Sequence, residues 1–82
     1  MKVVLLPQAQ ADLDEIYEPV LARVMRRLRL LERFPEIGAR MMGPFNGYRS
    51  TVVDMFRIVY RVMPRRVVEA AYIRDCRRAP LS

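Results

Sequence analysis

Apolar residues follow two different patterns along the first 34 positions. A short apolar run at residues 2–6 stops at Pro7, which predicts a buried strand. Residues 9–17 and then residues 19–34 place apolar side chains at helical spacing, which predicts two amphipathic helices. Pro19 suits the first turn of the second helix. Because the connection is so short, we expect the two helices to form an antiparallel hairpin. The apolar face of the first helix would consist of Ala9, Leu13, Ile16 and Tyr17.

The second half of the chain changes to the two-residue period of β-strands. Residues 40–47 contain two glycines and a proline and predict a loop. Beyond this loop the pattern predicts three strands joined by tight turns, at residues 48–53, 56–63 and 66–73. The order strand, helix, helix, strand, strand, strand predicts an α+β fold, with a helical hairpin packed on one face of a mainly antiparallel sheet. A chain of 82 residues is expected to form one such two-layer domain, residues 1–82.

Alternation along the middle strand of the three assigns its side chains to two faces. One face would carry Phe56, Ile58, Tyr60 and Val62 and pack on the helices. The opposite face would carry Arg57, Val59, Arg61 and Met63. We expect Arg49, at the start of the preceding strand, to share this second face. That face would then combine positive charge with apolar side chains.

Composition and charge narrow the classes of function. Hydrophobic residues make up 52% of the chain, as in a folded domain, and no apolar run approaches the roughly 18 residues of a membrane helix. One cysteine and no histidine argue against an internal disulfide and a structural zinc site, and favour a reducing cytoplasm. The net charge is +6, and residues 23–82 carry fourteen arginines against five acids. Such a surface suits an acidic protein or a nucleic acid, and a merely solvated basic surface is the alternative.

Acidic residues are concentrated in the first predicted helix, at Asp12, Asp14 and Glu15. They are expected in its first turns, where carboxylates interact favourably with the helix dipole. The sequence has no Gly-rich phosphate loop, no metal-ligand cluster and no Ser–His–Asp set. We therefore expect neither a cofactor nor a metal.

Several short motifs occur in one order along nearly the whole chain. They are PQAQADLDEIY after the first strand, LERFPEIG at the end of the second helix, GYRS and FRIVYRV in the next two strands, and AAYIRDCRR near the end. Together they resemble the RelE/ParE superfamily of toxins from bacterial type II toxin–antitoxin systems. The resemblance implies a cytoplasmic toxin that causes growth arrest and forms a hetero-oligomer with a small acidic antitoxin.

Two branches of the superfamily differ in their target. Toxins similar to ParE inhibit DNA gyrase by binding, whereas toxins similar to RelE cleave messenger RNA on the ribosome. The motifs FPEIG, FRIVYRV and IRDCRR look closer to the ParE branch, and no aromatic residue or histidine follows Ile73 for proton transfer. The resemblance thus favours a gyrase inhibitor without catalysis. An mRNA endoribonuclease is the alternative, and an inactive copy or a plain basic nucleic-acid-binding module is the second alternative.

Arginines are the candidate site residues for either target, because guanidinium groups stay charged and bind phosphate and carboxylate oxygens in a fork. If the chain is RelE-like, the resemblance implies that the catalytic cations are Arg49, Arg57, Arg77 and Arg78. The residues expected to bind the antitoxin or the target are Arg57, Arg61, Arg74, Arg77 and Arg78. Arg49 has a structural alternative, in which it donates hydrogen bonds to loop carbonyls and holds the sheet edge. For Arg57 and Arg61 the alternative is a solvated strand face.

Overall fold

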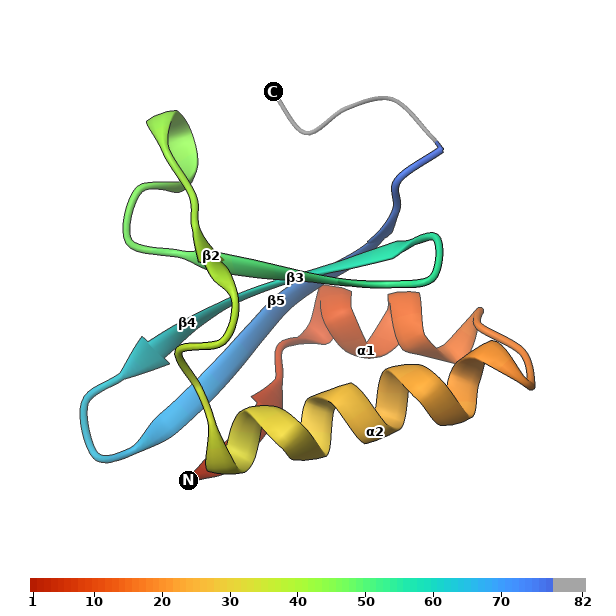
Figure 1. Ribbon diagram of the computed structural model, residues 1–82, viewed down its shortest axis with the longest axis horizontal. Coiled ribbons are helices and arrows are strands. Elements are labelled where there is room, and N and C mark those ends of the chain that lie inside the picture. Colours follow the sequence, from red (N-terminus) through yellow and green to blue (C-terminus); the bar gives the residue numbers. More distant parts are fainter. Residues whose placement is uncertain (78–82) are drawn as a thin grey trace.

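The fold has two helices against one face of a five-stranded sheet, as the computed structural model describes it for residues 1–77 (Figure 1). The helices are α1 (Pro7–Asp14) and α2 (Val20–Arg33). A short 3-10 helix, η1 (Gly43–Phe45), lies in the loop that connects the second and third strands. The strands are β1 (Lys2–Leu5), β2 (Ala39–Arg40), β3 (Arg49–Val53), β4 (Phe56–Met63) and β5 (Val67–Asp75).

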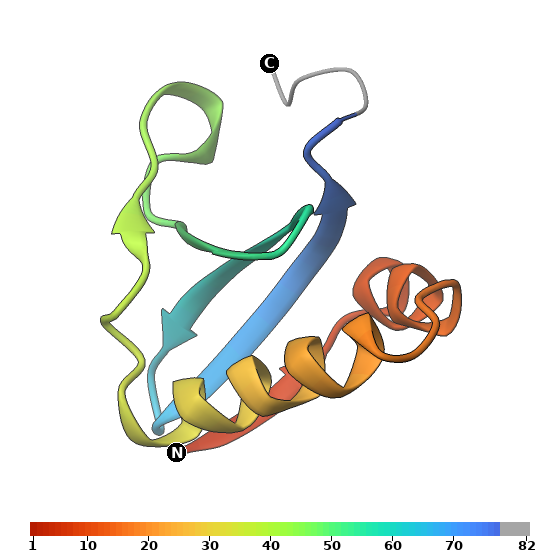
Figure 2. The ribbon, with the colours of Figure 1, turned by 45° about the vertical axis from the view of Figure 1, so that its right-hand side comes forward.

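The strands lie in the order β1-β5-β4-β3-β2. β1 is parallel to β5, and every other neighbouring pair is antiparallel. Figure 2 shows both helices on one side of the sheet and the η1 loop away from them. The predicted α+β fold, with a helical hairpin on a mainly antiparallel sheet, is therefore confirmed.

The bounds of three predicted elements need correction. The first helix begins at Pro7, because proline is favoured in the first helical turn, and it ends at Asp14 rather than at residue 17. Tyr17 consequently lies outside the helix and is 81% exposed, whereas the other three residues of its predicted face are buried. The predicted loop at residues 40–47 includes half of β2, whose two residues pair with Arg49 and Ser50. β5 continues to Asp75, two residues beyond the predicted end.

The acids of α1 lie at its C-terminal end, not in its first turns as predicted, because the helix starts earlier. Asp12 has a structural partner there. Its Oδ2 accepts a hydrogen bond from the backbone N–H of Ile73 at 3.0 Å, and its Oδ1 accepts one from Gln8 at 2.9 Å. Since β1 pairs with β5 only as far as Ala70, the Asp12 carboxylate serves a β5 donor that β1 does not reach.

The core lies between the helices and the sheet. From the helices it buries Ala9, Leu13, Ile16, Val24, Leu28 and Leu31, and from the sheet Val53, Ile58, Tyr60, Val68, Ala70 and Ile73. Phe56 packs against this cluster, as the alternation predicted, but Val62 at the far end of the strand is 39% exposed. The stripe of α2 and one face of β4 therefore supply most of the large buried side chains.

A change of register between β4 and β5 affects what the second face carries. Val59 pairs with Tyr72 while Tyr60 pairs with Ala70, so β5 has one extra residue, Ala71, at a β-bulge. Beyond the bulge, Ile73 still points to the core, and Tyr72 and Arg74 lie on the opposite face. Val59 is fully buried although it lies on that opposite face, so the second face of the sheet is partly covered.

Candidate functional site

Residues from three of the sequence motifs meet in one buried hydrogen-bond network. Tyr60 on β4 donates its hydroxyl proton to the carbonyl of Pro35 at 2.7 Å and accepts the N–H of Gly38 at 2.9 Å. Arg49 on β3 donates to the carbonyls of Gly38 at 2.8 Å and Glu36 at 3.3 Å. The network ties the FPEIG turn to the sheet.

Glycine is required at position 38 because the backbone passes so close to Tyr60. A Cβ at this position would lie 2.5 Å from the Tyr60 hydroxyl oxygen and 2.8 Å from the Ser50 carbonyl oxygen. Burial raises the pKa of the Tyr60 hydroxyl, although the hydrogen bond from Gly38 and the charge of Arg49 act in the opposite direction. The hydroxyl therefore stays protonated and can donate to Pro35.

Arg49 does not lie on the second face, contrary to the sequence prediction. Its Cα is the register partner of Tyr60, so its side chain lies on the helix side of the sheet. There it donates hydrogen bonds to the loop carbonyls of Glu36 and Gly38, which is the structural role given as the alternative for Arg49. The structure consequently separates Arg49 from Arg57, the next candidate residue on the neighbouring strand.

The second face brings two other candidate arginines together. Arg57 and Arg74 are register partners on β4 and β5. The Nε atom of Arg57 is buried, and among residues 1–77 it has no hydrogen-bond partner. Val52 is the register partner of Arg57 on the other side. Neither register partner of Arg57 is therefore a carboxylate.

Aromatic rings and a salt bridge also lie on this face. Phe45 of η1 makes edge-to-face contacts with Tyr48 and Tyr72, with ring centroids 6.2 and 6.4 Å apart. Arg61 lies over the Tyr48 ring at 5.3 Å and forms a salt bridge with Glu69 at 3.2 Å. Arg74 lies over the Tyr72 ring at 5.5 Å. The η1 loop thus packs on the face that sequence analysis expected to be open to a partner.

Arg77 lies two residues beyond the end of β5 and lines one pocket together with Arg74 and Asp75. Arg77 donates through Nη2 and Nε to the Asp75 carboxylate at 2.8 and 3.0 Å. This hydrogen bonding raises the pKa of the Arg77 guanidinium above its usual value. Arg78 lies outside the described residues.

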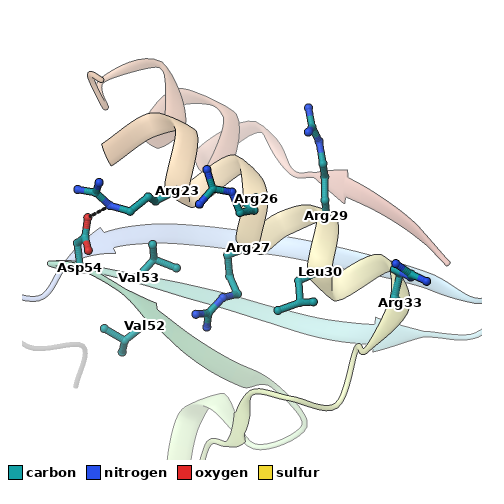
Figure 3. A pocket seen from close by; sticks show the side chains of 9 residues that line it. All are labelled: Arg23, Arg26, Arg27, Arg29, Leu30, Arg33, Val52, Val53 and Asp54. Carbon is teal, nitrogen blue, oxygen red and sulfur yellow. Dashed lines mark hydrogen bonds and ion pairs between the residues drawn. The ribbon is translucent and has the colours of Figure 1, made fainter. Parts of the chain in front are cut away.

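Sequence analysis missed a basic groove between α2 and β3, here called the α2–β3 groove (Figure 3). It is lined by Arg23, Arg26, Arg27, Arg29, Leu30, Arg33, Val52, Val53 and Asp54. Arg23 forms a salt bridge with Asp54 at 2.6 Å, and Arg27 donates a hydrogen bond to the Thr51 hydroxyl. The spacing of Arg23, Arg27 and Leu30 along α2 could have indicated a shared flank. The strand that completes the groove could not be inferred from that spacing.

The chemistry available at these surfaces is the binding of anions. No three histidine, cysteine, aspartate or glutamate side chains of residues 1–77 are grouped so that they could hold a metal ion. Over the same residues, no helix is long and apolar enough to cross a membrane. Both the second face and the α2–β3 groove instead present guanidinium groups beside apolar side chains.

Comparisons with known proteins point to one family. A family model described as ParE toxin of type II toxin–antitoxin system, parDE, matches residues 3–80. No curated protein matches the sequence significantly.

Three solved structures illustrate the similarity of the fold. The toxin–antitoxin complex RelBE2 from Mycobacterium tuberculosis has a similar chain with a TM-score of 0.81 and 22% identity, covering 90% of this chain and 95% of that one. For the chromosomal ParDE system from P. aeruginosa the TM-score is 0.75 and the identity 19%, with 92% and 95% covered. For the intact E. coli RelBE complex the values are 0.74 and 16%, with 88% and 92% covered.

Proposed function

Because the chain belongs to the ParE toxin family of type II toxin–antitoxin systems, we propose that it inhibits DNA gyrase by binding and has no catalytic step of its own. The observation that carries the proposal is the match of the family model over residues 3–80. The likeness to solved complexes does not discriminate between targets, since both RelBE and ParDE complexes share the fold. The proposal of gyrase as the target therefore rests on the family and on the interactions of the candidate arginines.

The hydrogen bonds and salt bridges that candidate arginines already make within the protein support binding rather than RNA cleavage. Cleavage by attack of a 2′-hydroxyl needs a group that moves a proton and free cations around the scissile phosphate. The chain has no histidine, Arg49 is engaged by loop carbonyls, and Arg77 is engaged by Asp75. Few of the expected catalytic groups are thus available on one face.

One observation favours the alternative of a RelE-like endoribonuclease. Arg57 and Arg74 are neighbours on the second face, and the buried Nε of Arg57 has no partner within residues 1–77. A phosphate oxygen would satisfy such a donor. Under this alternative, Arg57→Ala would abolish cuts within translated codons while the thermal unfolding midpoint changed little.

We further propose that a small acidic antitoxin neutralises the toxin as a hetero-oligomer in the cytoplasm. The similar solved chains come from toxin–antitoxin complexes, which supports a partner of this kind. The net charge of +6 supports an acidic one.

The test measures plasmid supercoiling by purified gyrase with increasing amounts of the folded chain. We expect supercoiling to be lost near equimolar toxin and gyrase, while messenger RNA 5′ ends in cells expressing the chain stay unchanged. Full supercoiling together with new 5′ ends inside codons would replace the proposal by the endoribonuclease. Full supercoiling with intact messages would indicate an inactive copy or a plain nucleic-acid-binding module.

A further inference from the structure

Exposed apolar side chains gather at the end of the molecule where α2 ends. Phe34 and Ile37, on either side of the FPEIG turn, are 54% and 45% exposed and line one pocket. Figure 1 and Figure 2 show the end of α2 and the β4–β5 turn together at this end. The surface, here called the FPEIG patch, comprises these two apolar side chains and four charged ones, Glu32, Arg33, Glu36 and Arg66. Large apolar side chains exposed side by side indicate an interaction site.

Hydrogen bonds fix the backbone of the FPEIG turn while its apolar side chains face solvent. Phe34 donates its N–H to the Leu30 carbonyl at 2.9 Å. The Tyr60 hydroxyl binds the Pro35 carbonyl at 2.7 Å and the Gly38 N–H at 2.9 Å. A contact surface that is already fixed loses little conformational entropy on binding. The turn therefore holds its apolar pair in place before any partner arrives.

The charged side chains of the FPEIG patch are balanced, unlike those of the chain as a whole. Two are glutamates and two are arginines, although the net charge of the chain is +6. All four are exposed, and within residues 1–77 none of them forms a salt bridge. An acidic protein or a nucleic acid would meet the two glutamates with charge of the same sign. A second copy of the patch, in contrast, offers an arginine for each glutamate.

We propose that the FPEIG patch is a contact between two copies of this chain related by a two-fold axis. In such a contact the same surface serves both partners, so the Phe34 and Ile37 side chains of each copy pack against those of the other. The glutamates of one copy lie near the arginines of the second copy, which offsets the repulsion between two chains of charge +6. Because the patch is small, the dimer is weak and reversible. The inference does not depend on the proposed gyrase target.

The experiment is sedimentation velocity of the full chain at concentrations from about 1 to about 500 µM. We expect the sedimentation coefficient to rise reversibly with concentration toward that of a dimer. Phe34→Ser and Ile37→Ser should each weaken the association at least about tenfold, because a two-fold dimer loses each side chain twice. Tyr17→Ser and Met42→Ser are matched controls that remove side chains 81% and 85% exposed outside the patch, and they should leave it nearly unchanged. Circular dichroism confirms that each variant is folded.

Two charge-reversed variants test how the copies recognise each other. One combines Glu32→Arg with Glu36→Arg, and the other combines Arg33→Glu with Arg66→Glu. Each variant alone should stay monomeric, because its patch then carries charge of one sign. The second variant also lowers the net charge of the chain, so its loss of association cannot come from overall repulsion. An equimolar mixture of the two should associate about as tightly as the wild type, which unfolded variants cannot imitate.

Several outcomes would overturn the inference. They are a monomer at every concentration, equal losses in Phe34→Ser and Tyr17→Ser, or a mixture of the charge-reversed variants that stays monomeric. A monomeric chain whose Phe34→Ser variant no longer inhibits gyrase would also overturn it and would assign the patch to the target protein. Supercoiling assays on the same preparations separate the two proposals. Gyrase inhibition by a chain that never dimerises removes only the dimer, and dimerisation without gyrase inhibition removes only the proposed target.

Discussion

Removing the Tyr60 hydroxyl tests whether the network around Gly38 holds the FPEIG turn to the sheet. In Tyr60→Phe, the buried N–H of Gly38 loses its acceptor and the Pro35 carbonyl loses its donor. A buried polar group left without a partner costs about 1–3 kcal/mol, and the part-buried carbonyl can regain a water molecule. We therefore expect the free energy of unfolding to fall by about 2 kcal/mol.

The assay is equilibrium unfolding in urea at neutral pH, followed by circular dichroism. In thermal unfolding of a domain of this size, the same loss of stability lowers the midpoint temperature by about 10 °C. Tyr17→Phe is the matched control because Tyr17 is 81% exposed, and its unfolding free energy should change by less than about 0.5 kcal/mol. A Tyr60→Phe protein as stable as the control would refute the assigned role of the network.

The remaining predictions concern pH and two neighbouring positions. The pKa of the Tyr60 hydroxyl is raised above its usual 10.0 in the folded state, so its contribution to the free energy of unfolding is fully present below pH 10 and is lost as the pH rises toward the folded-state pKa. Denaturant titrations should show stability falling more steeply above pH 10 in the wild type than in Tyr60→Phe, and parallel curves would contradict this. Asp12→Ala should lower the free energy of unfolding by about 2 kcal/mol, because the Ile73 N–H loses its acceptor. Asp14 is exposed, so Asp14→Ala should change it by less than about 0.5 kcal/mol, and equal effects in urea unfolding would count against the Asp12–Ile73 hydrogen bond. Gly38→Ala should cost about 2–3 kcal/mol in the same assay, since the new Cβ meets both a phenol oxygen and a backbone carbonyl, and an unchanged midpoint would show that the turn can move away.

Local periodicity was sufficient to predict the long elements. The predicted strand at residues 56–63 coincides with β4, and the apolar stripe of α2 supplies Val24, Leu28 and Leu31 to the core. These elements bury one face, so the spacing of their apolar residues already records the contacts that stabilise them. The two-layer α+β arrangement followed from their order.

Short elements and their ends depend on partners that the local sequence does not contain. β2 has two residues and exists because their backbone pairs with β3. The acids of α1 were placed at its start from the dipole argument, but Asp12 lies where it can accept from Ile73, 61 positions away. The extra residue Ala71 has no signal of its own, and the bulge appears only in the pairing of β4 with β5.

The sequence by itself determined the element order, the core stripe and the motifs that carry the family resemblance. Only the tertiary structure decided that Tyr60, Gly38 and Arg49 converge, which assigns Arg49 to the support of a loop. It also decided that the η1 loop covers part of the second face and that α2 and β3 form a basic groove. The physical reason is that backbone propensity and apolar spacing act between near neighbours, whereas these contacts join segments held together only by the folded core.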